Sequence, residues 1–304
     1  MATVERSSPA LRFRSSDGDL QRRKSVGRIG PWQLVRLLSE GSLTRTYLAT
    51  PAIGATTAPA YVLKLLRKEW WRDSQAIEMQ RREAWIGRRL THPHVASVLS
   101  AQVDQPPFYI VTPLLVGETA AEMLAAKRLP SLPLALWIAR QVAEALDALH
   151  RTLGMIHADV KPANILVAPD GHTTLLDFGC AQSASEARSC ASRPVVGTLH
   201  YVAPEMITSA CAIEPRCDIY GLGVTLYELL TGELPFDAAE PAQLVAMHRS
   251  AKPACIRSRR PELPKPVASL VHRMLAKEPL RRPESAMEVV EQLMRLEIDS
   301  FASR

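Results

Sequence analysis

The pattern of apolar and polar positions divides the chain into two parts. From Trp32 to about Val116 the pattern is typical of β-strands. A helical insert lies between Arg72 and Leu90 and ends at a proline-containing turn, residues 91–94. We therefore predict that this part of the chain forms a small lobe made mostly of β-strands.

A larger helical lobe is predicted after Gly117. Apolar residues recur there at helical spacing, and the two strongest apolar segments lie near 134–150 and 219–231. A polar stretch rich in Gly, Ser and Cys, residues 179–198, is too long for an ordinary connection, and long loops in compact domains are often functional. We expect an α+β fold with one β-rich and one helical lobe.

Composition and charge add a basic N-terminal arm to this picture. The chain has 304 residues, a net charge of +6 and 47% hydrophobic residues, which is a globular composition. The first 30 residues carry seven basic and three acidic side chains, and so hold +4 of that charge. They show no apolar periodicity and no signal-peptide core, so we expect a disordered, solvated leader. An arm that docks to nucleic acid or to a membrane is the alternative interpretation.

Membrane spans and structural cysteine sites are both disfavoured. No uncharged apolar run reaches the length of about 18 residues that a spanning helix needs. The five cysteines are odd in number and include no C-x-x-C pair, which argues against a zinc site and against a disulfide framework. A reducing compartment, the cytoplasm, is the expected location.

The sharpest chemical signal is a pair of motifs in the predicted helical lobe. Residues 157–164 read HADVKPAN, and a D-F-G triplet begins at Asp177, 18 residues after Asp159. The pattern H-x-D-x-K-P-x-N followed by D-F-G resembles the catalytic and metal-binding loops of the eukaryotic-like serine/threonine protein kinases. The resemblance runs from about Trp32 to Leu296 and implies the bilobal protein-kinase fold. The expected divisions are a tail at 1–30, an N-lobe at 31–115, a C-lobe at 116–298 and a C-terminal end at 299–304.

The resemblance implies phosphoryl transfer from ATP with a divalent cation. It makes Asp159 the residue that accepts or orients the proton of the substrate hydroxyl, and Lys161 a charge that stabilises the transferring phosphoryl group. Asn164 and Asp177 would supply the hard oxygen ligands that Mg²⁺ prefers. ATP and Mg²⁺ are therefore the expected cofactors, with Mn²⁺ as an alternative to Mg²⁺.

Residues upstream match the nucleotide site of the same family. Lys64, at the end of an apolar strand, matches the lysine that pairs with the α- and β-phosphates. Its carboxylate partner on the following helix is expected to be Glu83 rather than Glu78. The adenine pocket is expected at Thr112 as gatekeeper, the carbonyl of Pro113, the backbone of Leu115, and Leu166 beneath the ring.

The loop that covers the phosphates departs from the family pattern G-x-G-x-x-G-x-V. Residues 39–46 read SEGSLTRT, so that only Gly41 survives of the three glycines. Side chains at Ser39 and Thr44 should weaken or reshape the cradle, because glycines allow the backbone to approach phosphates closely. Thr46 also replaces an apolar residue that covers adenine, and Val62 is bulkier than the usual alanine, so we expect modest affinity for ATP.

The end of the long loop and the helices after it supply further matches. Thr198 is expected to contact the catalytic aspartate and lysine, and Tyr201 to help form the pocket beside the acceptor residue. Asp218 is expected to open an apolar helix and to serve also as its N-cap. The structural positions implied by the resemblance are Phe178, Gly179, Thr198, Glu205, Asp218 and Arg282, with Arg282 placed to pair with Glu205.

Two further departures carry expectations about regulation. Ala158 replaces an arginine that in many relatives pairs with a phosphorylated activation segment, which alanine cannot do. We therefore expect that activity does not depend strongly on phosphorylation between residues 180 and 198. Gly87 stands four residues after Glu83, where the family usually has a large apolar residue. It is expected to leave a gap and to weaken its helix by about 1 kcal/mol relative to alanine.

These observations favour a protein serine/threonine kinase that transfers the γ-phosphate of ATP to Ser/Thr hydroxyls of a protein substrate. The alternative is a pseudokinase or weakly active nucleotide-binding scaffold, because the glycine loop is degenerate while the metal and proton residues remain. A small-molecule phosphotransferase is disfavoured by the peptide-docking segment that ends at Glu205. We expect no specific nucleic acid partner and no membrane span, and leave open a regulatory partner or a homodimer.

Overall fold

The chain divides into two units that do not follow one another simply along the sequence. The structure is a computed structural model that describes residues 26–53, 60–183, 186, 199–207 and 213–302. The first unit comprises Met1–Thr91 and Ala96–Glu118, and the second comprises His92–Val95 and Thr119–Arg304. Most of the expected basic tail, residues 1–25, lies outside the described residues.

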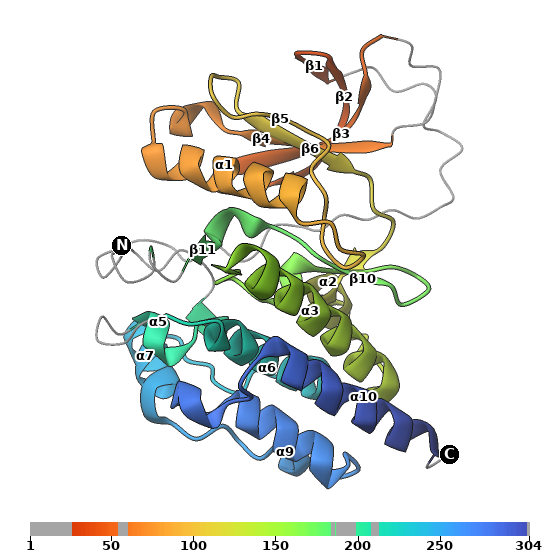
Figure 1. The fold of residues 1–304 in the computed structure, drawn as a ribbon, viewed down its shortest axis with the longest axis vertical. Coiled ribbons are helices and arrows are strands. Elements are labelled where there is room, and N and C mark those ends of the chain that lie inside the picture. The colour runs from red at the N-terminus through yellow and green to blue at the C-terminus, as the bar shows by residue number, and fades with distance from the viewer. Residues whose placement is uncertain (1–25, 54–59, 184–185, 187–198, 208–212, 303–304) are drawn as a thin grey trace. The chain divides into compact units, whose positions relative to one another are not determined.

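A six-stranded antiparallel sheet forms the framework of the first unit (Figure 1). Its strand order is β1-β2-β3-β4-β6-β5, so the strand that carries Lys64, β4, lies between two others. The strands are β1 (Gly27–Ile29), β2 (Trp32–Glu40), β3 (Thr44–Pro51), β4 (Tyr61–Leu66), β5 (Ser100–Gln102) and β6 (Tyr109–Pro113). Apolar side chains from β2, β3, β4 and β6 form a buried cluster around Leu63 and Val111, which anchors the sheet.

Among the described residues of the first unit, one α-helix accompanies this sheet, as the sequence predicted between residues 72 and 90. After the 3-10 helix η1 (Lys68–Trp70), α1 runs over Ser74–Arg89. The side chain of Asp73 caps its first turn, because it accepts a hydrogen bond of 2.7 Å from the amide of Ala76. The buried face of α1 includes Glu83 and lies against β4 and β6.

The prediction that Gly87 leaves a gap in the packing is wrong. A Cβ atom at Gly87 would lie only 2.5 Å from Cγ2 of Val98. The amide of Val98 also donates a hydrogen bond of 2.8 Å to the carbonyl of Gly87. The side chain of Val98 occupies the place that a larger residue would take, so glycine is needed at Gly87 for this close approach.

The second unit is mainly helical, which together with the sheet of the first unit confirms the α+β prediction. Its helices are α2 (Ala120–Ala125), α3 (Leu132–Leu153), α5 (Pro204–Ile207), α6 (Arg216–Thr231), α7 (Pro241–Ser250), α8 (Ile256–Arg259), α9 (Lys265–Met274) and α10 (Ala286–Ala302). The long helix α3 packs against both α6 and α10 (Figure 1). Nearly every side of α6 is buried, as expected for a helix with apolar residues all round.

Short strands and 3-10 helices carry the chemistry-bearing loops of the second unit. The strands are β7 (Glu118–Thr119), β8 (Met155–Ile156), β9 (Ile165–Val167), β10 (Thr173–Leu175) and β11 (Gln182–Ser183), paired as β10-β9-β7 and β11-β8. The 3-10 helices are η2 (Pro162–Asn164), η3 (Phe178–Cys180), η4 (Leu199–Tyr201) and η5 (Pro279–Arg281). The two pairs β8/β11 and β9/β10 bracket the segments 157–164 and 177–180, and so fix where those loops begin and end.

A four-residue segment from the middle of the first unit's sequence belongs to the second unit. Val95 forms an isolated parallel bridge with Leu175, whose amide donates a hydrogen bond of 2.8 Å to the carbonyl of His94. The ring of His94 is also fixed, because Nδ1 lies 2.8 Å from the carbonyl oxygen of Thr173. These bonds attach residues 92–95 to strand β10.

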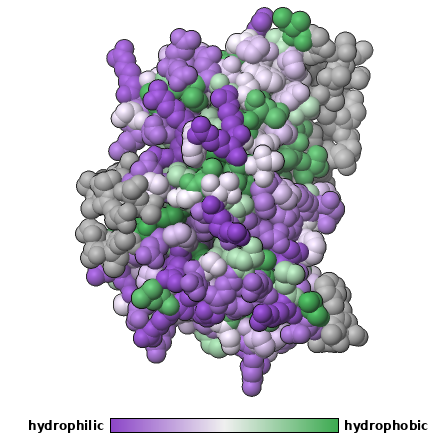
Figure 2. All heavy atoms as spheres, in the orientation of Figure 1, coloured by the Kyte–Doolittle hydropathy of each residue, from purple (hydrophilic) through white to green (hydrophobic). Residues whose placement is uncertain are grey.

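Polar side chains dominate the face of the molecule seen in Figure 2, where apolar ones lie in small separate groups. This is the surface expected when most large apolar side chains are packed inside each unit. Within the part of the chain that the structure describes, no helix combines the length and the apolar character needed to cross a membrane.

Candidate active site

In the first unit, Lys64 and Glu83 form an ion pair. Nζ of Lys64 lies 2.8 Å from Oε2 of Glu83, and the two side chains are only 21% and 11% exposed. Glu78 instead lies 3.6 Å from Arg82, on the same helix. The structure therefore brings Lys64 together with Glu83, which α1 presents from its buried face.

The sheet register places several expected nucleotide residues beside Lys64. Thr46 on β3 pairs directly with Lys64 on one side and with Ser39 of β2 on the other. Two residues before Lys64, Val62 pairs with Thr112 of β6. The four positions are therefore held by one continuous ladder of backbone hydrogen bonds.

The remaining expected adenine contacts are divided between the two units. Pro113 ends β6 and pairs with Tyr61, and Leu115 follows it with an exposed fraction of 36%. The amide of the intervening residue Leu114 donates to the carbonyl of Ala60 at 2.8 Å. Leu166 belongs to the second unit, where it is buried in β9.

In the second unit, residues 157–164, the candidate catalytic loop, fold back on themselves around Asp159. Nζ of Lys161 donates to Oδ2 of Asp159 at 2.7 Å. Helix η2 then turns the chain so that Nδ2 of Asn164 donates to the same Oδ2 at 3.0 Å and to the carbonyl of Asp159 at 2.9 Å. Three residues that the sequence spaces over six positions thus meet at one carboxylate.

The environment of Asp159 perturbs its ionisation. Burial raises the pKa of this carboxyl above its usual value, because it disfavours the charged form. The ammonium of Lys161 opposes that effect by charge and by hydrogen bonding, whereas the charge of Asp177 adds to it. A carboxylate with a raised pKa is a better proton acceptor than an exposed one.

The D-F-G turn is packed against the catalytic loop. Asp177 has a left-handed backbone with φ of 60°, and its Oδ1 accepts a hydrogen bond of 3.4 Å from the amide of Gly179. Phe178 is fully buried and meets the ring of His157 edge-on, with 5.0 Å between the ring centres. Nε2 of His157 also lies 3.2 Å from the carbonyl oxygen of Leu176. These contacts fix Asp177 relative to the loop that holds Asp159.

The donor set is suited to a hard divalent cation. Both hydrogen bonds from Nδ2 of Asn164 go to Asp159, so its carbonyl oxygen is the side-chain atom left to act as a ligand. Asp177 would add an anionic oxygen. Among the described residues, no group of three His, Cys, Asp or Glu side chains could hold a metal. An amide and a carboxylate fit Mg²⁺, which commonly takes few protein ligands and completes its shell with phosphate and water.

Asp218 binds the backbone at the start of the candidate catalytic loop and does not cap a helix. The prediction that it is an N-cap is wrong, because α6 begins earlier, at Arg216, and Pro215 is the cap residue. Instead, the two carboxylate oxygens of Asp218 accept hydrogen bonds of 2.8 Å from the amides of His157 and Ala158. The Asp218 carboxylate therefore holds the backbone of the loop directly.

A histidine that sequence reasoning missed completes this anchor. Nε2 of His150, near the end of α3, lies 2.8 Å from Oδ2 of Asp218. Burial by itself would raise the pKa of Asp218, but the hydrogen bond and charge of His150, with those of His157, hold the pKa below its usual value. No motif marks His150. The available signal was its position in the last turn of the helix that precedes the candidate catalytic loop.

A second buried ion pair joins the segment before α6 to the segment before α10. Nη1 and Nη2 of Arg282 lie 2.6 and 2.8 Å from the two carboxylate oxygens of Glu205. Arg282 also donates to the carbonyl of Arg216 at 3.0 Å. This fork-to-fork geometry satisfies a guanidinium that is fully buried.

The segment that leads into α5 is described from residue 199 onward, so Thr198 lies outside the described residues. Tyr201 donates a hydrogen bond of 2.6 Å to Oε2 of Glu228 on α6. Burial, together with the charge of Glu228, raises the pKa of Tyr201 far above its usual value, so the phenol stays protonated. Glu228 was not predicted as a site residue, and its position within an apolar helix was the available signal.

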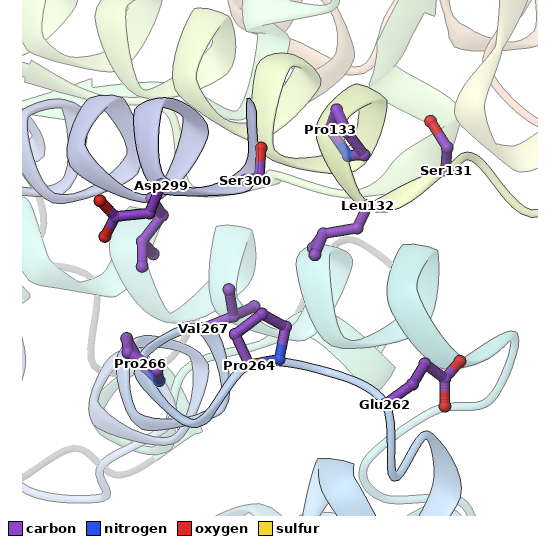
Figure 3. Close-up of a pocket in the computed structure, with 10 residues that line it drawn as sticks. Ser131, Leu132, Pro133, Glu262, Pro264, Pro266, Val267, Asp299 and Ser300 are labelled. Atoms are coloured by element: carbon purple, nitrogen blue, oxygen red, sulfur yellow. The ribbon is translucent and has the colours of Figure 1, made fainter. Parts of the chain in front are cut away.

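A separate cavity of about 350 Å³ lies in the second unit between the ends of three helices (Figure 3). It is lined by residues of α3, α9 and α10 and of the connections before them: Ser131, Leu132, Pro133, Glu262, Pro264, Pro266, Val267, Leu296, Asp299 and Ser300. None of the candidate catalytic or nucleotide-binding residues lines this cavity.

Comparison with known families agrees with this geometry. The family described as protein kinase domain matches residues 32–294, which cover both units. The chain belongs to the protein kinase family. The matched range includes the Lys64–Glu83 pair, the loop around Asp159 and the buried Glu205–Arg282 pair.

Curated relatives of this kinase domain include bacterial serine/threonine-protein kinases. PrkC of Bacillus subtilis is 30% identical over 260 residues, which are 86% of this chain and 39% of that protein. PknH of Mycobacterium bovis is 34% identical over 273 residues, or 88% of this chain and 44% of that protein. PknE of the same species is 32% identical over 265 residues, or 86% and 45%. The kinase domain thus spans about two fifths of the length of the curated relatives it matches.

Proposed function

We propose that the chain is a serine/threonine protein kinase that transfers the γ-phosphoryl group of ATP to hydroxyls of a protein substrate. The observation that carries the proposal is the loop in which Lys161 and Asn164 both donate to the carboxylate of Asp159. The kinases named among its relatives act on serine or threonine, which supports that acceptor class.

Side chains of both units would handle the nucleotide. Lys64, held by Glu83, would contact the α- and β-phosphates, and Asn164 and Asp177 would hold Mg²⁺. Mg²⁺, or Mn²⁺ in its place, would neutralise charge on the phosphates of the bound nucleotide. In the first unit, the expected adenine contacts are Val62, Thr46, Thr112 and the backbone of residues 113–115, and the hairpin with Ser39 and Gly41 would contact the phosphates. Leu166 would contribute from the second unit.

Asp159 would act on the acceptor hydroxyl. Its carboxylate would accept the hydroxyl proton as the oxygen forms a bond to the γ-phosphorus atom. The bond from that phosphorus to the β–γ bridging oxygen breaks in the same transfer, and ADP carries away the electron pair. Lys161 donates a hydrogen bond to Asp159 and would place its positive charge beside the phosphoryl group during transfer.

The other residues that match the family pattern would have positioning roles in this reaction. Phe178 and Gly179 hold Asp177, while Asp218 holds the backbone of the catalytic loop. Glu205 and Arg282 tie the segment after Tyr201 to the rest of the second unit. We infer that Thr198 contacts Asp159 and Lys161, and that Tyr201 shapes the place where the peptide docks.

A cytoplasmic site of action is part of the proposal. It is supported by five cysteines that are odd in number and include no C-x-x-C pair, a pattern typical of a reducing compartment. Fractionation of cells that produce the natural protein, followed by detection with an antibody, tests the location.

The deciding experiment measures transfer of labelled phosphate from Mg-ATP to the protein itself and to a generic basic protein. Asp159→Asn and Asp177→Asn should each lower incorporation by about 100-fold or more, because they remove the proton acceptor and a metal ligand. Asp170→Asn is the matched control, since Asp170 is an exposed carboxylate in the β9–β10 turn of the same unit. Its activity should equal that of the parent.

The label should appear on Ser or Thr in the parent and in the control only. If the parent binds ATP but transfers nothing, the protein is a nucleotide-binding scaffold, as the altered glycine loop allows. Transfer that survives both Asp159→Asn and Asp177→Asn would show that the phosphoryl group moves at a different site.

A further inference from the structure

The tip of the β2–β3 hairpin is fastened to the segment that follows β4. The family pattern has three glycines here, and this chain keeps only Gly41. The turn is closed by a hydrogen bond of 2.8 Å from the amide of Gly41 to the carbonyl of Thr44.

Three successive carbonyl oxygens at the tip accept hydrogen bonds from residues 67–70. Nη1 of Arg67 donates to the carbonyl of Gly41 at 3.1 Å. Nε1 of Trp70 donates to the carbonyl of Ser42 at 3.0 Å. The backbone amide of Arg67 donates to the carbonyl of Leu43 at 2.9 Å. No sequence motif marks this set of contacts.

Packing and charge support the same fastening. Leu43 packs against a buried cluster of Leu66, Ala76 and Phe108, in which Trp70 and Trp71 also take part. The Arg67 side chain is 27% exposed, and its Nη2 lies 2.6 Å from Oε1 of Glu69, which fixes the orientation of the guanidinium. The tip therefore has both polar and apolar attachments to the start of the α1 region.

Peptide geometry gives these bonds a consequence for the amides of the tip. In a trans peptide the N–H points opposite to the C=O of the same unit. The carbonyls of residues 41, 42 and 43 share their peptide units with the amides of Ser42, Leu43 and Thr44. Because residues 67–70 hold the carbonyls, the three amides point away from that segment. Successive backbone N–H groups in a turn form a concave site suited to anions.

We propose that Arg67 and Trp70 are positioning residues for the phosphates of ATP. They orient the amides of residues 42–44 by hydrogen bonding, in place of the glycine-rich backbone that this chain lacks. The inference rests on the proposed function, because that function supplies the nucleotide. It also links the hairpin to the strand of Lys64, which lies three residues before Arg67.

The chain offers a matched pair of variants for the test. Trp70→Phe keeps an aromatic ring but removes the N–H that bonds to the hairpin. Trp71→Phe is the control, since Nε1 of Trp71 donates to the carbonyl of Leu66 at 3.0 Å and not to the hairpin. Both variants lose one indole donor beside the same apolar cluster, so a general loss of packing or stability should affect them alike.

The measurement is calorimetric titration of the full chain with Mg-ATP and, separately, with adenosine. Trp70→Phe and Arg67→Ala should each raise the Kd for ATP by about five- to tenfold, the size expected for one lost hydrogen bond. The Kd for adenosine, which has no phosphates, should change by less than about twofold. Trp71→Phe should bind both ligands as the parent does, and Arg67→Lys should recover part of the ATP affinity.

Kinetics and exchange add independent readouts. The KM for ATP should rise in Trp70→Phe more than kcat falls, and amide hydrogen exchange of residues 39–46 should quicken without ligand. The inference is overturned if Trp70→Phe weakens ATP and adenosine equally, or if it behaves as Trp71→Phe does. A parent that binds ATP without transferring phosphate would defeat the proposed function and leave this inference standing. A parent that binds no ATP would overturn both.

Discussion

At the scale of single residues, Ala158 shows how the catalytic loop is held in an unfavourable conformation. Its backbone is left-handed, with φ of 64°, while its amide donates to Asp218 at 2.8 Å. A left-handed residue other than glycine costs roughly 1–2 kcal/mol. The buried carboxylate of Asp218 therefore stabilises a backbone conformation that alanine would not choose by itself.

Substitutions of Ala158 should reveal that cost. Ala158→Gly should raise the free energy of unfolding by about 0.5–1 kcal/mol, because glycine tolerates the positive φ although its unfolded chain is more flexible. Ala158→Val should lower it by about 2 kcal/mol, since a β-branched residue fits this conformation poorly. Denaturant unfolding of each variant is the measurement.

The control for these variants is Ala163→Gly, in the neighbouring helix η2 where the backbone is not left-handed. It should lower the free energy of unfolding, because only the entropic cost of glycine remains. A loss of stability in Ala158→Gly equal to that in Ala163→Gly would show that residue 158 is not strained.

At the scale of secondary-structure elements, α1 depends on a close approach between helix and loop. Gly87→Ala should lower the free energy of unfolding by about 1–3 kcal/mol, although alanine is the better helix former, because its Cβ would overlap Val98. Thermal or denaturant unfolding measures the effect. The same substitution in a Val98→Ala background should cost less, since the overlapping methyl groups are gone. Equal costs in both backgrounds would contradict this account.

The elements also show what could be predicted from the sequence. Asp159, Lys161 and Asn164 were predicted because their spacing matches a family motif confined to one local loop, and α1 was predicted because its apolar pattern is periodic. The Gly87–Val98 contact was missed because these residues lie on different elements, and the sequence does not say which side chain fills the space beside a glycine. Arg67 and Trp70 were missed because their partners are backbone carbonyls, which leave no trace in residue identity.

At the scale of the whole molecule, a buried histidine ties stability to pH. His248 on α7 is fully buried, with Nδ1 2.9 Å from the hydroxyl oxygen of Tyr220 and the ring of Phe236 packed at 5.1 Å. Burial, together with the charges of Lys277 and His200, lowers the pKa of His248 to about 4. The folded protein therefore keeps this imidazole neutral at pH values where the unfolded chain protonates it.

The sign of the pH effect follows from that difference. Between pH 6.5 and 4 the unfolded chain binds the proton and the folded one does not, so stability should fall as pH falls. Protonation of His248 in the unfolded chain should lower the free energy of unfolding by up to about 3 kcal/mol over this pH range. Urea unfolding between pH 7 and pH 4 measures it, with His248→Gln as the variant that cannot titrate. The parent should lose its stability advantage over the variant as pH drops; an advantage that stays constant would contradict the assignment.

The attachment of residues His92–Val95 to strand β10 has a consequence for how the chain can be divided into fragments. The chain changes unit at three points along the sequence, after residues 91, 95 and 118. A fragment that starts at Thr119 therefore lacks the backbone partner of Leu175, and a fragment that ends at Glu118 carries that partner with nothing to pair it to. Two halves expressed from a break at residue 118 should become stable only when mixed, which makes this boundary suited to a split reporter rather than to separate expression of each unit.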